Sequence, residues 1–183
     1  MLEVASRRAS LATLHGRYGA EAMLVDVTSR GVEPWMRFSP FYPHGQIPVP
    51  FSPGFWSQSV EGVWQGLKVF ARADVDPTRF AITTMRGIKR SARQWGEVLG
   101  HREGVQGERL LPYAEARLAI YVPSYRWVLD HRLSEQLSAL REMLSERTVV
   151  LLDYETNGDV RDLARPLSHA WLIIHYLEET WPV

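Results

Sequence analysis

The chain has 183 residues, of which 45% are hydrophobic and 23% are charged, a balance typical of a globular protein that buries a core without cross-links. Its 21 basic residues match its 21 acidic residues, and zero net charge argues against extended binding to duplex DNA or to an anionic membrane surface. Cysteine is absent, which excludes disulfides, thiolate nucleophiles and cysteine-ligated zinc and makes a cytoplasmic location the natural expectation. No apolar run approaches the ~20 residues of a membrane-spanning helix.

The first predicted elements are a strand at residues 21–27 and a loop at 28–34. Residues 38–58 then contain five prolines and six aromatic residues. Proline at this density excludes a helix or a central strand. Because six aromatic residues are too many for a disordered segment, we expect an ordered, packed loop.

A helix is predicted to follow, from an N-cap at Ser57 or Ser59 to about Ala71. Apolar residues at helical spacing form one side of it: Val60, Val63, Trp64, Leu67 and Phe70. Gly62 and Gly66 cost helix stability, so their presence indicates that another part of the chain approaches closely.

The second half of the chain is predicted to be richer in helix. The expected elements are helical pieces within 78–99, a glycine-rich polar loop at 101–107, helices at 112–121 and 134–144, the clearest strand at 148–154, a turn at 156–159, and a last helix from Pro166 to about Glu179. No repeat or linker is present. We therefore expect one mostly helical α+β domain with a small sheet, spanning residues 1–183.

Glu61 is the best single candidate for chemistry. Glu61, Gln65 and Lys68 follow one another at i, i+4 and i+7, which on a helix forms a polar stripe beside the apolar face. Glu61 could be a solvated carboxylate that complements the helix N-terminus. It could instead be a carboxylate held against the aromatic loop and ready for acid–base work.

Other charged residues have equally open roles. Lys89 and Arg90 could form an anion site or a solvated helix face. Asp153 and Asp159 flank the end of the clearest strand, where site carboxylates are common, although Asp159 also suits a turn. The six histidines lack metal-ligand spacing, and no phosphate-binding glycine loop is present, so we expect neither a metal nor a cofactor.

Two segments carry a resemblance to a known family. Residues 39–43 read Ser-Pro-Phe-Tyr-Pro, and residues 59–70 read Ser-Val-Glu-Gly-Val-Trp-Gln-Gly-Leu-Lys-Val-Phe. These resemble the front half of the NADAR (YbiA-like) family, which reads Ser-Asn-Phe-Tyr-Pro and then Val/Ser-Glu-His-x-x-Gln-x-x-Lys-x-Phe. Weaker likenesses extend the match to roughly residues 35–175. The sequence also resembles an uncharacterised bacterial family with the same proline-rich loop.

The chain departs from the NADAR pattern at several positions. Pro40 stands where that family has Asn, Gly62 where it has His, and Asp153 where it has Glu. The Trp-Gly that closes the family's motif is missing after Asp159.

The resemblance implies a NADAR-like fold and an N-glycosidase that acts on a ribosylated or ADP-ribosylated nucleotide-like substrate. Glu61 would stabilise the ribosyl cation or activate water, with Asp159 or Asp153 as a second carboxylate. The implied substrate-binding residues are Phe41, Tyr42, Gln65, Lys68, Lys89, Arg90 and Trp95, with Lys68, Lys89 and Arg90 holding phosphate and an aromatic ring stacking on the base. The alternative is a non-catalytic module on the same scaffold that binds a nucleotide or ADP-ribosyl group or an interaction partner.

Overall fold

The computed structural model describes residues 1–182 and confirms the α+β class, with about 39% helix and about 17% strand. The chain divides into two compact units. Unit 1 is built from Met1–Ser39 and Leu129–Val183, and unit 2 from Pro40–Val128. The second boundary falls within helix α5 (Val122–Arg132), without a linker.

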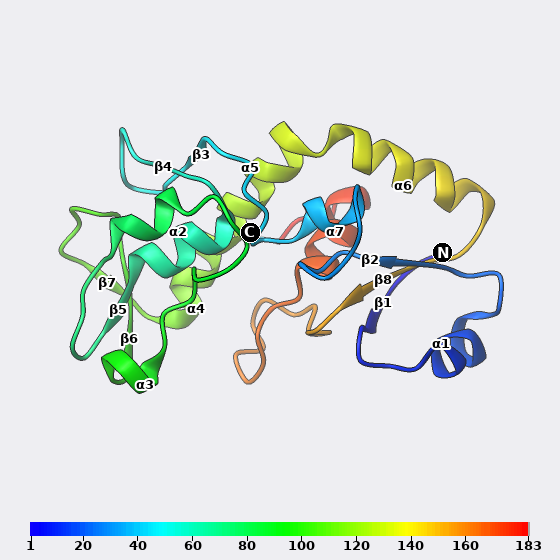
Figure 1. Ribbon diagram of the computed structural model, residues 1–183, viewed down its shortest axis with the longest axis horizontal. Helices are drawn as coiled ribbons and strands as arrows, with labels where there is room; N and C mark the ends of the chain where they lie inside the picture. Colours follow the sequence, from blue (N-terminus) through cyan, green and yellow to red (C-terminus); the bar gives the residue numbers. More distant parts are fainter. Residues whose placement is uncertain (183) are drawn as a thin grey trace. The chain divides into compact units, whose positions relative to one another are not determined.

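Unit 1 contains a three-stranded parallel sheet in the order β1-β8-β2 (Figure 1). The strands are β1 (Leu2–Ser6), β8 (Val149–Asp153) and β2 (Met23–Asp26), so the predicted strands at 148–154 and 21–27 are confirmed. The apolar start of central β8 is fully buried, as expected for the middle of a parallel sheet. β1 has no counterpart among the predictions.

Three α-helices lie wholly within the described part of unit 1. They are α1 (Leu11–Tyr18), α6 (Ser134–Glu146) and α7 (His169–Leu177). α6 confirms the predicted helix at 134–144. α7 begins after its N-cap Ser168 and not at Pro166, because Leu167 forms a β-bridge with Asn157 and the Ser168 amide donates to the Asn157 carbonyl.

Unit 2 combines an antiparallel sheet with short helices. Its elements are the sheet β5 (Lys68–Phe70), β6 (Val98–Arg102) and β7 (Leu110–Leu111), the hairpin β3 (Ile47–Pro48) and β4 (Trp56–Ser57), the helices α2 (Val60–Leu67), α3 (Ala92–Trp95) and α4 (Tyr113–Ala116), and the 3₁₀ helix η2 (Pro77–Ala81). The proline-rich segment is ordered, as predicted, with β3 and β4 embedded in it. A 3₁₀ helix, η1 (Trp35–Phe38), precedes it in unit 1.

Helix α2 is shorter than predicted. It ends at Leu67, and Lys68 has an extended backbone that begins β5, so the polar stripe expected through Lys68 is not wholly helical. The Arg90 guanidinium donates to the carbonyls of Gln65 and Lys68, which satisfies groups that a helix end leaves unpaired. The predicted close approach is confirmed, because a Cβ on Gly66 would overlap the ring of Phe80.

Three other predictions for unit 2 need correction. His101 and Arg102 end strand β6 and do not belong to a loop. The helical pieces predicted within 78–99 are η2 and α3, but the end of that range is wrong because Val98 and Leu99 are in β6. The helix predicted to end at 121 continues through the π-helix η3 (Arg117–Tyr121) into α5. The wider turns of the π-helix come directly before Pro123. Because proline has no N–H, it cannot donate the hydrogen bond that a regular α-helical turn requires at this position.

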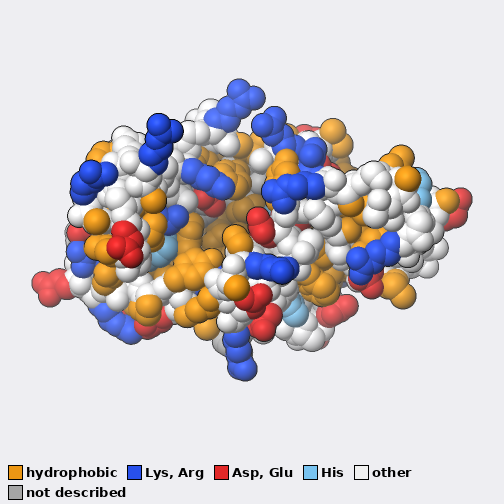
Figure 2. Space-filling view, turned by 90° about the horizontal axis from the view of Figure 1, so that it is seen from below, with side chains coloured by type: hydrophobic (Ala, Val, Ile, Leu, Met, Phe, Trp, Pro, Cys, Tyr) orange, Lys and Arg blue, Asp and Glu red, His pale blue; other side chains and the backbone are white. Residues whose placement is uncertain are grey.

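None of the helices in the described part of the chain has both the length and the apolar character needed to cross a bilayer. Basic and acidic side chains are interspersed on the face drawn in Figure 2, in keeping with the equal numbers of the two charges.

Candidate functional site

The candidate site in unit 2 begins at the first turn of α2. Ser59 caps this helix, with its Oγ accepting from the Gly62 amide at 3.0 Å. The Glu61 amide donates to the Pro40 carbonyl at 2.8 Å, which joins the proline-rich segment to the start of the helix. The Glu61 side chain is buried, with 7% of the residue exposed. Its interpretation as a solvated first-turn carboxylate is wrong.

A chain of two hydrogen bonds fixes the Glu61 carboxylate. The Arg90 amide donates to Gln65 Oε1 at 3.0 Å, and Gln65 Nε2 donates to Glu61 Oε1 at 2.8 Å. Because a backbone N–H can only donate, it sets the orientation of the Gln65 amide and aims the Nε2 group at Glu61. Within the predicted polar stripe, Glu61 and Gln65 thus make a direct hydrogen bond.

Burial shifts the protonation of this group. Desolvation raises the pKa of Glu61, and it outweighs the hydrogen bond from Gln65 and the charges of Lys89 and Lys68, which act in the opposite direction. Burial also lowers the pKa of Lys68, against the attraction of Glu61. A carboxylate with a raised pKa is suited to accept a proton during a reaction near neutral pH.

The chain contains two lysines among its 21 basic residues, and the charges of both act on Glu61. The Lys89 ammonium lies 5.2 Å from the centre of the Phe41 ring, and the Lys68 ammonium lies 5.8 Å from the centre of the Trp64 ring. Neither ammonium group has a hydrogen-bond or ion-pair partner within residues 1–182. Both therefore keep their donors available for an anionic ligand.

Arg90 has a different environment from the two lysines. Besides its bonds to Gln65 and Lys68, its guanidinium donates to the Asp74 carbonyl at 2.8 Å and lies over the Phe70 ring. These contacts fix the junction between α2 and β5. The observed role of Arg90 is thus to support the lysine-bearing backbone, and phosphate binding by it stays a prediction.

The predicted aromatic residues are placed unequally. Phe41 belongs to the Glu61 surroundings through its contact with Lys89 and its position next to Pro40. Tyr42 packs on His44, and Trp95 lies at the end of α3. Among the described residues, neither Tyr42 nor Trp95 hydrogen-bonds to Glu61.

His101 and Trp64, which the sequence does not predict as site residues, lie next to Lys68. His101 pairs with Lys68 across β5 and β6, and its ring lies 3.7 Å from that of Trp64, centroid to centroid. His101 is 1% exposed, and neither ring nitrogen reaches a hydrogen-bond partner at normal geometry in the described chain. Such a buried unpaired group costs about 1–3 kcal/mol. The sequence predicts helical pieces up to residue 99 and a loop from His101, so it misses strand β6, which places His101 opposite Lys68.

The protonation of His101 follows from these surroundings. Burial lowers its pKa to about 3, and the charge of Lys68 adds to this effect, while a poorly aligned hydrogen bond with the Trp64 backbone opposes it. The imidazole is therefore neutral at physiological pH.

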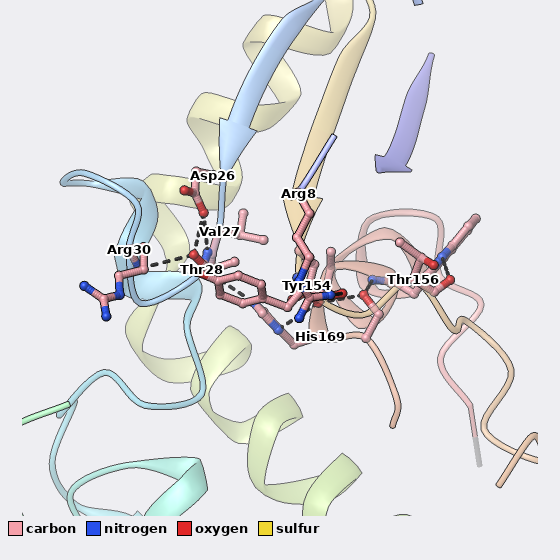
Figure 3. Close-up of polar contacts among 12 residues, drawn as sticks. Arg8, Asp26, Val27, Thr28, Arg30, Tyr154, Thr156 and His169 are labelled. Atoms are coloured by element: carbon pink, nitrogen blue, oxygen red, sulfur yellow. Dashed lines mark hydrogen bonds and ion pairs between the residues drawn. The ribbon is translucent and has the colours of Figure 1, made fainter. Parts of the chain in front are cut away.

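In unit 1, the carboxyl ends of the three parallel strands gather a polar network (Figure 3). Asp153, at the end of β8, accepts from Ser168 Oγ at 2.7 Å and lies 3.0 Å from His169 Nδ1. His169 Nε2 lies 2.9 Å from the Val27 carbonyl, just after β2. Asp153 is thus fully engaged in joining β8 to the start of α7.

The charges in this network stabilise each other. Burial would raise the pKa of Asp153, but the charge of His169 and the hydrogen bonds from His169 and Ser168 outweigh it and hold the pKa at about 2. Burial would lower the pKa of His169, but the charge and hydrogen bond of Asp153 raise it. The pair is an imidazolium and a carboxylate.

The edge of the same sheet also carries arginines. Arg7 Nε donates to Asp26 at 2.6 Å, and the guanidinium groups of Arg7 and Arg8 lie over the Tyr154 ring. Figure 3 shows Arg8 directed along Tyr154, whereas Arg30 is directed away from it. Arg7 and Arg8 therefore meet at the Tyr154 ring, and Arg30 does not join them.

Asp159 lies in the predicted turn and is exposed. Its Oδ1 accepts from the Arg161 amide at 2.8 Å, and its own amide donates to Asn157 Oδ1. Both contacts are those of a turn residue. Asp153 and Asp159 belong to unit 1, whereas every residue that hydrogen-bonds to Glu61 belongs to unit 2. A second carboxylate for Glu61 therefore stays a prediction.

Of three comparisons with known proteins, only the scan against family models found a match. A search of curated proteins and a search of solved structures each found no match. Over residues 1–182, no group of three or more histidine, aspartate or glutamate side chains is arranged to hold a metal ion. A family model matches residues 6–173, which is most of the chain. The chain therefore belongs to DUF6939, a family of unknown function.

Proposed function

We propose that this protein is an N-glycosidase that cleaves a ribosylated or ADP-ribosylated nucleotide-like substrate at the bond between ribose and base. The observation that carries the proposal is the buried Glu61 carboxylate, oriented by Gln65 and accompanied by the chain's two lysines. The resemblance to the NADAR family supports it, because the motif residues Glu61 and Gln65 make a direct hydrogen bond.

The chemistry needs one well-placed carboxylate. When the bond between C1′ and the base nitrogen breaks, its electron pair stays on the nitrogen and positive charge develops on the ribosyl group. Glu61 would stabilise this charge or take a proton from the water that attacks C1′. That proton finally resides on the departing base, so the products are the free base and the free ribosyl compound.

The lysines would bind the phosphate part of the substrate. Each ammonium offers three donors and a compact positive charge, which suits a phosphate oxygen. Lys89 is exposed and Lys68 half-buried, so both are within reach of a bound ligand at the surface of unit 2. Phe41 beside Lys89 would contribute an apolar wall.

The remaining parts of the proposal come from the sequence. Asp159 or Asp153 would supply a second carboxylate, and the reaction would proceed in the cytoplasm on a small molecule without a cofactor. The alternative is a non-catalytic module that binds a nucleotide or ADP-ribosyl group. The structural contacts of Asp153 and Asp159 favour this alternative, because a turn and a buried ion pair already account for both residues.

Incubation of the purified protein with ribosylated and ADP-ribosylated bases tests the proposal. Chromatography should detect the free base and an equal amount of the free ribosyl compound. Binding of these compounds without product would refute the glycosidase and support the binding module. Absence of both would refute both functions.

A further inference from the structure

Trp64 stands out within helix α2. Seven of the eight residues of this helix are buried, and Trp64 is the exception. It follows Glu61 by three positions, a spacing that places the two side chains next to each other on a helix surface. A large apolar ring is therefore partly open to solvent beside the buried carboxylate.

The Trp64 ring is held in place by other rings. The His101 ring lies 3.7 Å away and is tilted by 32°, whereas Tyr113 and Tyr121 approach at 5.9 and 5.8 Å in edge-on arrangements. Because three neighbours fix the indole, a ligand that stacks on it would not have to immobilise a free side chain first.

His101 gives an independent reason to consider this ring group functional. It is buried, and the contact of its ring with the Trp64 backbone falls short of normal hydrogen-bond geometry, so neither ring nitrogen has a well-formed hydrogen bond. Unpaired buried polar groups in a folded protein are uncommon. Here the polar ring backs the indole, directly opposite Lys68 in the sheet register.

We propose that the indole of Trp64, backed by His101, is the surface on which the planar base of the substrate stacks. The inference rests on the proposed function and deepens it. It assigns base recognition to Trp64, next to Glu61, and not to Trp95, which ends α3. The ligand class is a planar heteroaromatic base that carries a phosphorylated ribose, with the phosphate directed to the lysines.

Calorimetric titration with two probes tests this assignment. Guanosine 5′-monophosphate carries a base, whereas ribose 5-phosphate carries the same phosphate without one. Trp64→Leu should weaken binding of the nucleotide about 10-fold or more, the range expected for a lost stacking contact. It should leave ribose 5-phosphate within about 2-fold. Trp56→Leu, at an exposed tryptophan in β4, is the matched control and should change neither titration.

Fluorescence keeps the test decisive if Trp64→Leu fails to fold. The emission of Trp64 is the difference between the emission of wild type and that of Trp64→Phe. The nucleotide should quench this emission, and ribose 5-phosphate should leave it unchanged. The inference would be overturned if Trp95→Leu lost affinity for the nucleotide while Trp64→Leu kept wild-type affinity. It would also be overturned if wild type bound neither probe. Base release by wild type without quenching of Trp64 would overturn it while the glycosidase stands. Quenching without base release would support stacking while the glycosidase fails.

Discussion

His169 Nδ1 lies 3.0 Å from Asp153 Oδ2 in the interior of unit 1, and the opposite ring nitrogen of His169 lies 2.9 Å from the Val27 carbonyl. A carbonyl and an ionised carboxylate both accept hydrogen bonds and cannot donate them. The imidazole satisfies both only when each of its nitrogens carries a proton. His169 is thus a buried cation that ties the ends of β2 and β8 to α7.

This arrangement predicts a specific dependence of stability on pH. Because the folded state raises the pKa of His169, its contribution to the free energy of unfolding is complete below the unfolded pKa and is lost as pH rises through the folded pKa. Because the pKa of Asp153 is lowered to about 2, its contribution is lost as pH falls from about 4 toward 2. Urea unfolding between pH 2 and 10 should show both losses.

His169→Gln should abolish the loss of stability on the alkaline side, since glutamine does not titrate. The half-buried His15 of α1 offers a matched control, and His15→Gln should keep the wild-type profile. An alkaline loss of the same size in His169→Gln would assign it to another group.

Asp153→Asn should destabilise the protein by about 3–5 kcal/mol, the cost of removing one partner of a buried ion pair. The reason is that His169 would lose its counter-charge while remaining buried. Thermal unfolding followed by circular dichroism measures this effect at pH 6, where His169 is protonated. A melting temperature equal to that of wild type would show that the ion pair contributes nothing.

Asp159→Asn should melt within about 2 °C of wild type, because asparagine supplies the same oxygen acceptor to the Arg161 amide. Its activity decides the second carboxylate of the proposed mechanism. Unchanged base release would show that Asp159 has only its structural role in the turn. A loss of about 10²-fold without a change in melting temperature would show that catalysis requires the charge of Asp159.

Lys89→Met should weaken the binding of ribose 5-phosphate by about 10-fold or more, since a charge-assisted hydrogen bond contributes about 1.5–3 kcal/mol. Ribose without phosphate should bind equally to the variant and to wild type. Arg86→Met, in the same exposed segment, is the control and should keep wild-type affinity. Equal weakening in both variants would indicate a diffuse charge effect and not a phosphate contact.

The sequence predicted the elements whose pattern is local. β8 and α6 could be identified because a β-branched apolar run and a leucine face at helical spacing each specify one structure. The hydrogen bond between Glu61 and Gln65 followed from a spacing of four residues on a helix.

The rest depends on contacts between distant residues. The end of α2 at Leu67 is set by Arg90 and by the pairing of Lys68 with His101, more than 20 positions further along the chain. The Glu61 amide is paired with the Pro40 carbonyl, 21 positions earlier in the chain, and Asp153 is paired with His169. The pattern of apolar and polar residues within one segment does not indicate which distant residues will contact it.

Glu61→Gln removes the negative charge of the proposed catalytic carboxylate. Glutamine keeps the size of the side chain and cannot ionise. Since burial raises the pKa of Glu61, its ionisation opposes folding, and the variant should be at least as stable as wild type at pH 7. Base release from a ribosylated substrate should fall by at least about 10²-fold while binding persists, and Glu97→Gln, an exposed control, should keep full activity. Wild-type turnover in Glu61→Gln would show that Glu61 is not the catalytic carboxylate.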